Sequence, residues 1–309
     1  MNPLRHVLAT AVLTTAVLIP AGSVFGQVAP PQARMAEAPE GVYLIIRSDD
    51  AGMSHAVNMA TKQLLETGLP VSVSIMFPCP WYGEMVEILR EHPDVAVGAH
   101  LTLNSEWRHY RWGPIVGREA APSLVDEDGY FFQSAAALYE NEPDPGEVER
   151  ELRAQIERAL ATGLRIDYLD FHMGTATRHP EFRAIVERLG SEYGLGLSGY
   201  SGEQMQDPQY WAQPEAKLDS LLAMVRRLER GYHVVITHPG LNTPELAALV
   251  DMNIDNPLEN MSAHRQGELN ALTSPAFAEA LDRFGITPIT YRELFAMVRQ
   301  RERSGQHRP

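Results

Sequence analysis

Short apolar runs rich in β-branched residues recur along the chain, with longer amphipathic stretches between them. Such runs are typical of strands that are buried on both faces, as in a parallel sheet. On this pattern we expect strands at residues 42–47, 70–77, 95–103, 166–171, 195–197, 233–237 and 286–289.

The intervening stretches have the spacing of helices. The clearest covers residues 147–161, where Val148, Leu152 and Ile156 recur at every fourth position and Gly163 follows the end. Ser54 is placed to cap another helix at its amino terminus. The remaining helices are expected at residues 54–65, 81–91, 180–189, 214–230, 274–284 and 291–300.

Strand and helix therefore alternate about seven times in one chain of 309 residues. This alternation predicts parallel strands with helices outside them. We expect an α/β fold of one domain over residues 41–303, an irregular (β/α)-barrel of about seven strands that is similar to a TIM barrel. An open, doubly wound sheet is the alternative.

The ends of the chain have a different composition. Arg5 precedes an apolar run, LATAVLTTAVLI, and small residues follow, which is the pattern of a cleavable secretory signal over residues 1–26. An uncleaved membrane anchor is the alternative. Residues 27–40 are expected to be a disordered lead-in and residues 304–309 a tail. The signal predicts a periplasmic or secreted protein with no stable membrane anchor after cleavage.

Charge and cysteine content exclude some functions. The net charge is −14, from 26 basic and 40 acidic residues, so nucleic acid is not an expected partner, and a neutral small molecule or oligosaccharide fits better. Cys79 is the single cysteine, so no intramolecular disulfide can form. We expect Cys79 to be a small buried residue rather than a catalytic thiol.

Acidic and imidazole side chains stand where several predicted strands end. These are Asp49 and Asp50, His100, His172 and His238. The carboxyl ends of parallel strands share one face of the fold, and active sites form there. Aspartate and histidine from separate strands at one rim indicate a divalent-metal site with an acid and a base beside it.

The residues suggest a division of roles. One carboxylate of the Asp pair can ligate a metal while the other serves as a base, because neighbouring side chains alternate in direction along a strand. Asp170, two residues before His172, is expected to orient that imidazole. His238 is either a third ligand or a proton donor; because one Asp and two His already suffice as ligands, the donor role is more economical.

Aromatic residues and one arginine are candidates for contact with substrate. A long insertion at residues 104–144 contains Trp107 and Trp112, which either stack on a sugar ring or pack the loop. Arg265 either meets a substrate or an acid near the site, or forms a salt bridge on a helix surface.

The chain resembles the YdjC-like carbohydrate deacetylases, which include chitooligosaccharide deacetylases. The resemblance rests on five short motifs in family order, spanning most of the chain: SDDAG, GAHLTL, LDFH, THPG and HRQGEL. It implies a distorted (β/α)-barrel and hydrolysis of an N-acetyl group from a sugar. It also implies a divalent metal held by Asp50, His100 and His172, with Asp49 as general base and His238 as proton donor.

Three positions depart from the family pattern. Arg47 stands where the family has Asn, Ala51 where it has an aromatic residue, and Gly174 where it has a second His. None of these is a proposed ligand, so the departures bear on the substrate rather than on the metal. Zn is the favoured metal, with Mg, Mn, Ni and Co as alternatives. An esterase or amidase with the same site, and a non-catalytic exported sugar-binding protein, are the competing functions.

Overall fold

The computed structural model describes residues 39–253 and 260–305. The expected signal at 1–26, nearly all of the lead-in and the last residues of the tail lie outside this part of the chain. Within it, no helix is both long enough and apolar enough to cross a membrane.

The centre of the fold is an eight-stranded sheet in which every pairing is parallel. The strand order is β5-β4-β3-β2-β1-β7-β6, and β8 pairs with the first half of β1. The strands are β1 (Val42–Ala51), β2 (Val71–Ile75), β3 (Ala96–Leu101), β4 (Ile166–Phe171), β5 (Gly196–Leu197), β6 (Gln204–Gln206), β7 (Gly231–Thr237) and β8 (Ile286–Ile289).

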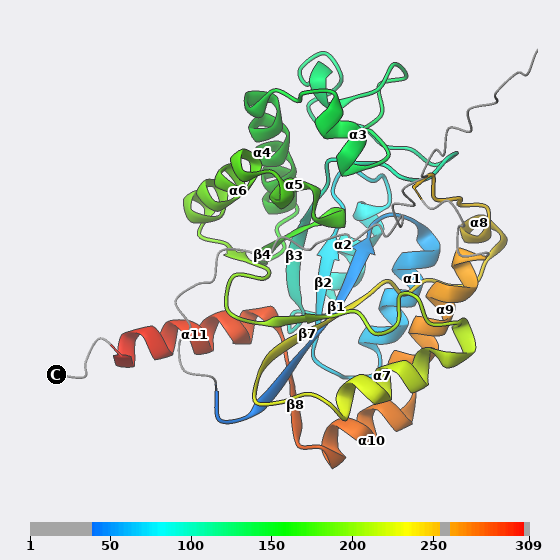
Figure 1. Cartoon of the computed structure of the whole chain (residues 1–309), viewed down its shortest axis with the longest axis vertical. Coiled ribbons are helices and arrows are strands. Elements are labelled where there is room, and N and C mark those ends of the chain that lie inside the picture. Colours follow the sequence, from blue (N-terminus) through cyan, green and yellow to red (C-terminus); the bar gives the residue numbers. More distant parts are fainter. Residues whose placement is uncertain (1–38, 254–259, 306–309) are drawn as a thin grey trace, which may run out of the picture.

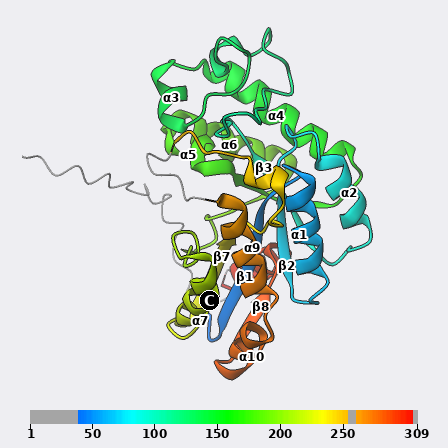
Figure 2. The same cartoon turned by 90° about the vertical axis from the view of Figure 1, so that its right-hand side faces the viewer.

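The predicted barrel is confirmed as a curled parallel sheet that is not closed by pairing, since β5 and β6 form the two ends of its strand order. The helices of the described residues are α1 (His55–Leu65), α2 (Tyr82–Arg90), α3 (Ala135–Glu140), α4 (Pro145–Ala161), α5 (Thr175–Arg178), α6 (Pro180–Tyr193), α7 (Lys217–Val225), α8 (Pro244–Ala247), α9 (Met261–Leu272), α10 (Pro275–Arg283) and α11 (Tyr291–Gly305), with 3₁₀ turns η1 (Pro122–Leu124), η2 (His172–Gly174) and η3 (Pro214–Ala216). Most of them lie around the outer face of the sheet (Figures 1 and 2), whereas α11 packs against its inner face.

The sequence located most of these elements, with a few differences. Ser54 caps α1 as expected, accepting a hydrogen bond from the Val57 amide. The helix expected at 214–230 is instead η3 followed by the shorter α7, and α11 runs five residues past the expected end, to Gly305. Five of the described strands and helices lie outside every expected range: β6, α3, α5, α8 and α9. The first four are six residues long or shorter, and α9 has no clear periodic pattern of apolar residues.

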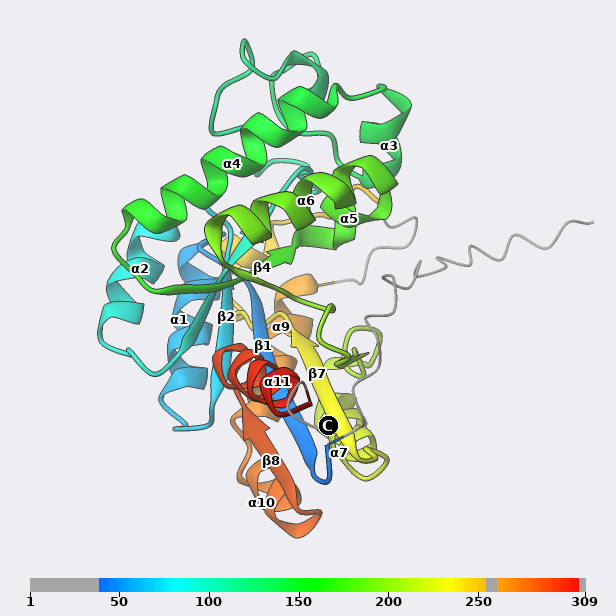
Figure 3. The same cartoon turned by 90° about the vertical axis from the view of Figure 1, so that its left-hand side faces the viewer.

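Two apolar cores lie on the two faces of the curled sheet. The larger one fills the space between the strands and the outer helices. The smaller one lies inside the curl, where Leu294 and Phe295 of α11 pack on Ile45, Tyr168 and Val234. Figure 3 shows α11 lying across this part of the sheet. A carboxy-terminal helix therefore covers the inner face that a closed barrel would fill with strand residues alone.

The inner face also decides which side chains reach the rim. Side chains alternate along a strand, so residues two apart share a face. Ile45 lies inside, and Arg47 and Asp49 follow it on the same face. Ala96 of β3 and Tyr168 of β4 likewise lie inside, which places His100, Asp170 and His172 in the same series.

Asp50 is out of phase with that series, and a local irregularity turns it inward. The register of β1 against β2 shifts between Ser48 and Ala51, and Asp50 has a φ of 62°. Asp tolerates the left-handed region better than most residues because its short polar side chain can bond locally. The bulge explains why β1 continues through the Asp pair and still presents both carboxylates at one rim.

The insertion after β3 is ordered and partly buried. It contains η1 and α3, and Trp107, Trp112 and Phe131 are all buried within it. Its start is tied to a distant segment, because the Arg108 amide donates to the Val250 carbonyl. Figure 1 shows α3 at the end of the molecule toward which β1 points. The insertion therefore covers the carboxyl rim of the sheet.

Candidate metal centre

Three ligand atoms from three strands converge at the carboxyl rim. Asp50 Oδ1 lies 3.6 Å from His100 Nε2 and 3.3 Å from His172 Nδ1. The two ring nitrogens are 3.3 Å apart. All three side chains are buried, and together they form a group that could hold a metal ion. The sequence predicted this trio, and the structure brings it together.

Each imidazole is held from its other nitrogen by a carboxylate. His100 Nδ1 lies 2.9 Å from Asp170 Oδ2, and His172 Nε2 lies 3.0 Å from Glu106 Oε2. A carboxylate on the outer nitrogen fixes the proton there and leaves a lone pair on the inner nitrogen. Both inner nitrogens are therefore oriented as ligands toward the same point as Asp50 Oδ1.

These partners differ from the sequence expectation in two ways. Asp170 orients His100, not His172, because His100 is its direct neighbour on β3 in the parallel register. The partner of His172 is Glu106, which lies in the insertion after β3. No strand-end pattern marks Glu106, so its role depends on how the insertion folds back over the rim.

The geometry of the trio fits a metal better than it fits hydrogen bonds. Charged hydrogen bonds are usually about 2.7–2.9 Å long, shorter than any separation in the trio. Two ligands about 2.1 Å from one metal at a tetrahedral angle are about 3.4 Å apart. Among the described residues Asp50 Oδ1 is buried and has no hydrogen-bond partner. A metal would supply the missing partner.

The charge of the cluster is compatible with a bound divalent cation. The carboxylates bonded within it are Asp49, Asp50, Glu106 and Asp170, and the guanidinium groups are Arg47 and Arg265. With both imidazoles neutral, four negative charges against two positive ones leave an excess of two, which one divalent cation or two protons on the imidazoles would balance. Buried charges are tolerated only when they are compensated.

The local field acts strongly on the ionisable groups. Burial lowers the pKa of His100, but the carboxylates of Asp49 and Asp170 outweigh it and raise that pKa to about 9. In the same way burial is outweighed by Glu106 and Asp50 at His172, whose pKa rises to about 10. Burial opposes ionisation of Asp50, yet Arg265 and the two imidazoles hold its pKa well below the usual range. The centre thus favours positive charge, whether protons or a metal provide it.

Asp49 lies beside the trio and is held by Arg47. The guanidinium donates from Nε and Nη2 to both carboxylate oxygens, each over 2.7 Å, and its Nη1 is 2.8 Å from Asp170 Oδ1. Nη1 also donates to Ser198 Oγ over 2.7 Å. Burial raises the pKa of Asp49, with Arg47 opposing the shift. Arg47 therefore places a buried cation between two carboxylates of the site.

Arg265 reaches the centre from α9. Its Nη2 donates to Asp50 Oδ2 over 2.7 Å, and its guanidinium lies over the Trp107 ring, 5.7 Å from the centroid. Arg265 is buried, so it meets an acid of the site and not a partner on the helix surface. One oxygen of Asp50 is thus fixed by Arg265 while the other is directed at the two imidazoles.

His238 follows β7, the strand that neighbours β1 on the side away from β2. Its predecessor Thr237 pairs with Ser48, so His238 is adjacent in register to Asp49. The His238 amide donates to Glu268 Oε2 over 2.6 Å. Its ring lies 5.9 Å from that of Tyr210, and its Nδ1 has no hydrogen-bond partner among the described residues.

The two tryptophans proposed for sugar contact are not surface residues. Trp107 is 2 % exposed and Trp112 is 4 % exposed. Trp112 donates from Nε1 to the Asn104 carbonyl over 2.9 Å and lies edge-on to His172 at 6.2 Å. These contacts favour the alternative that both rings pack the insertion against the centre.

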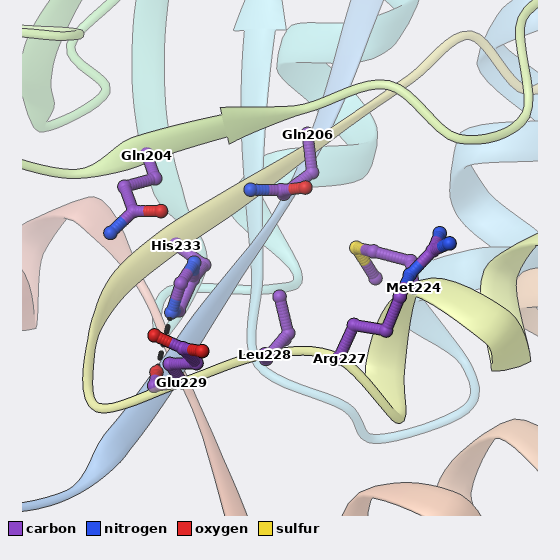
Figure 4. A pocket seen from close by; sticks show the side chains of 7 residues that line it. All are labelled: Gln204, Gln206, Met224, Arg227, Leu228, Glu229 and His233. Carbon is purple, nitrogen blue, oxygen red and sulfur yellow. Dashed lines mark hydrogen bonds between the residues drawn. The ribbon is translucent and has the colours of Figure 1, made fainter.

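Two further features lie apart from this chemistry. Cys79 is buried, and burial raises the pKa of its thiol well above the usual range, which fits a structural residue. A cavity of about 140 Å³ lies between β6, the first half of β7 and the end of α7. Figure 4 shows the side chains that line it. His233 lines it, while the candidate metal centre lies beyond the carboxyl ends of the strands.

Comparison with known proteins gives a consistent result. A carbohydrate deacetylase from Geobacillus stearothermophilus is 28 % identical over 269 residues, covering 82 % of this chain and 99 % of the relative. A carbohydrate deacetylase from Brevibacillus brevis is 34 % identical over 150 residues, covering 48 % of this chain and 56 % of the relative.

Solved structures and family models agree with this. The crystal structure of an Enterococcus faecalis protein, described in connection with cellobiose-phosphate cleavage, superposes with a TM-score of 0.70 at 25 % identity, covering 82 % of this chain and 99 % of that one. The model of the family described as YdjC-like protein matches residues 43–283. That match contains every residue of the candidate centre, and the chain belongs to the YdjC-like family.

Proposed function

We propose that this protein is a metal-dependent carbohydrate deacetylase that hydrolyses the acetamido group of an N-acetylated sugar or oligosaccharide. The observation that carries the proposal is the convergence of Asp50, His100 and His172 on one point, where Asp50 Oδ1 has no hydrogen-bond partner among the described residues. The relatives named as carbohydrate deacetylases support the choice of reaction.

Different residues of the chain would serve as metal ligands, general base and proton donor. Asp50, His100 and His172 would hold the metal, with Zn favoured by a donor set of two imidazoles and one carboxylate. A divalent metal in such a site polarises a carbonyl and lowers the pKa of water. Asp49 accepts the proton of the attacking water, and Arg47 keeps its carboxylate in place. His238 donates a proton to the departing amine, which needs one because an amide anion is a poor leaving group.

The test is acetate release from N-acetylglucosamine oligomers. Purified protein is stripped with a chelator and then given Zn, Mg, Mn, Ni or Co. We expect chelation to remove the activity, a divalent metal to restore it, and N-acetylated sugars to be preferred over O-acetylated ones. Release that survives complete metal removal would contradict metal dependence, and a preference for O-acetyl groups would indicate an esterase.

We also propose that residues 1–26 direct export and are removed, which would place the enzyme where extracytoplasmic glycans are its substrates. The support is Arg5 followed by the apolar run and small residues. We expect the mature protein from an exporting host to begin at Gln27, as measured by intact mass and amino-terminal sequencing. Recovery of the uncleaved chain in membranes would indicate an anchor instead.

A further inference from the structure

Trp211 is the most exposed large hydrophobic side chain in the described part of the chain. It is 68 % exposed, whereas the others in that class lie near 40 %. Aromatic side chains gain much of their stabilising effect by burial, so leaving an indole in water forgoes that gain. An exposed indole is readily explained if a ligand covers it.

The position of Trp211 connects it to the candidate centre. Its ring lies edge-on to Tyr210 with centroids 4.9 Å apart, and the Tyr210 ring lies 5.9 Å from that of His238. The indole is therefore no more than about 11 Å from the His238 ring, the sum of these two separations. Tyr210 is half-buried between them, and burial together with the charge of Asp251 raises its pKa to about 12.

A buried lysine holds the segment that carries Trp211. Lys217 is fully buried, and its Nζ donates to the carbonyls of Gln209 and Tyr210 over 2.7 and 3.3 Å. The same Nζ lies 3.3 Å from Glu268 Oε1, while Glu268 Oε2 accepts from the His238 amide over 2.6 Å. One ion pair thus anchors both the Tyr210–Trp211 segment and the turn that carries His238.

Burying an ammonium group is costly unless it is compensated, and here carbonyls and a carboxylate compensate it. α9 also packs tightly at this place, because a Cβ on Gly267 would lie 2.7 Å from the Pro214 carbonyl oxygen. The exposed indole is therefore mounted on a backbone fixed relative to His238. An aromatic residue on a fixed backbone suits binding, since little main-chain freedom is lost when a ligand docks.

We propose that Trp211 is the stacking face of a sugar-binding subsite beside His238, and that its occupant is a pyranose ring of the oligosaccharide substrate. This rests on the proposed function in one respect: the amine that receives the proton of His238 places a sugar ring next to that side chain. One or two pyranose rings span the distance from there to Trp211. The stacking role considered for Trp107 and Trp112 then belongs to Trp211.

The test measures binding separately from turnover. The probe is the glucosamine trimer, the deacetylated product, which binds without being hydrolysed and is titrated into the metal-loaded protein by calorimetry. We expect Trp211→Ala to raise its Kd about tenfold and Trp211→Tyr to retain most of the affinity, because an aromatic face remains. Trp211 is exposed, so neither change should affect folding. Phe284→Ala is the matched control: an aromatic side chain 41 % exposed, placed just before the amino-terminal end of β8, whose loss should leave Kd unchanged.

A second variant tests whether the Lys217–Glu268 ion pair holds the Tyr210–Trp211 segment in place. Lys217→Met removes the ammonium but keeps most of the side-chain volume, and we expect faster amide hydrogen exchange at residues 207–212 together with a raised Kd. A Trp211→Ala protein that binds the trimer within twofold of the wild type would overturn the subsite, whether or not acetate is released. Trp211-dependent binding without any acetate release would instead refute the proposed reaction and leave the subsite standing.

Discussion

Asp49→Asn is expected to abolish acetate release while the protein keeps its metal. The carboxylate lies beside the centre with both oxygens held by Arg47, and an amide in its place cannot accept the proton of the attacking water. Loss of a general base typically costs about 10²–10⁴-fold in rate. The measurement is kcat on the N-acetylglucosamine trimer, with metal content determined on the same sample. Turnover near the wild-type value would exclude Asp49 as the base.

The substitution also removes a buried ion pair, so its effect on stability must be separated from its effect on chemistry. Asp167 provides the matched control, because it is a buried carboxylate bound by Arg292 at 2.9 Å but lies at the other end of β4 from Asp170. Asp167→Asn should lower the melting temperature in a similar way and leave kcat per folded molecule unchanged. Equal losses of kcat in both variants would mean that unfolding, and not base removal, explains the result.

His100→Ala is expected to remove both metal and activity. The imidazole supplies one of three converging ligand atoms, and without it Asp50 and His172 alone remain around the binding point. Glu106→Gln should give a graded effect, since Gln can still accept from His172 but lacks the charge. Loss of such an outer carboxylate typically weakens metal binding by about 10- to 100-fold. Metal titration with activity read at each concentration measures both variants.

Together, His100→Ala and Glu106→Gln distinguish a metal ligand from a residue that only orients a ligand. Added metal should rescue Glu106→Gln at higher concentration and should not rescue His100→Ala. His109→Ala is the control, because this histidine is exposed in the same insertion as Glu106 and contributes nothing to the cluster. Stoichiometric metal and full activity in His100→Ala would show that the trio is not the metal site.

The repeating strand pattern was enough to predict the barrel and much of its rim. Parallel strands that are buried on both faces carry a continuous apolar signal, and their carboxyl ends must share one face. The strand pattern therefore placed the Asp49–Asp50 pair, His100 and His172 at one rim, and the family resemblance selected Asp50 as the ligand. The same logic placed His238 at that rim, and the structure shows that its strand pairs with β1. Local sequence carries this information because strand direction and side-chain alternation are local properties.

The strand pattern could not predict side-chain contacts between different strands. Asp170 shares a face with His172, two residues along one strand and nearly 7 Å away, whereas the next strand of a sheet is about 4.8 Å away. It therefore bonds His100, its neighbour in register. Arg47 does reach Asp49 two residues along, because its side chain is long.

The sequence by itself determined the fold class, the rim and the candidate metal trio. Only the tertiary structure decided what surrounds them: Glu106 behind His172, Arg265 on Asp50, and the Lys217–Glu268 pair behind His238. These partners come from the insertion and from α7 and α9, and pairing between such distant segments has no local period to reveal it. The tertiary structure also decided which tryptophans are exposed, because the burial of a ring depends on the segments that pack over it. Trp107 and Trp112 are buried, and Trp211 is open to water.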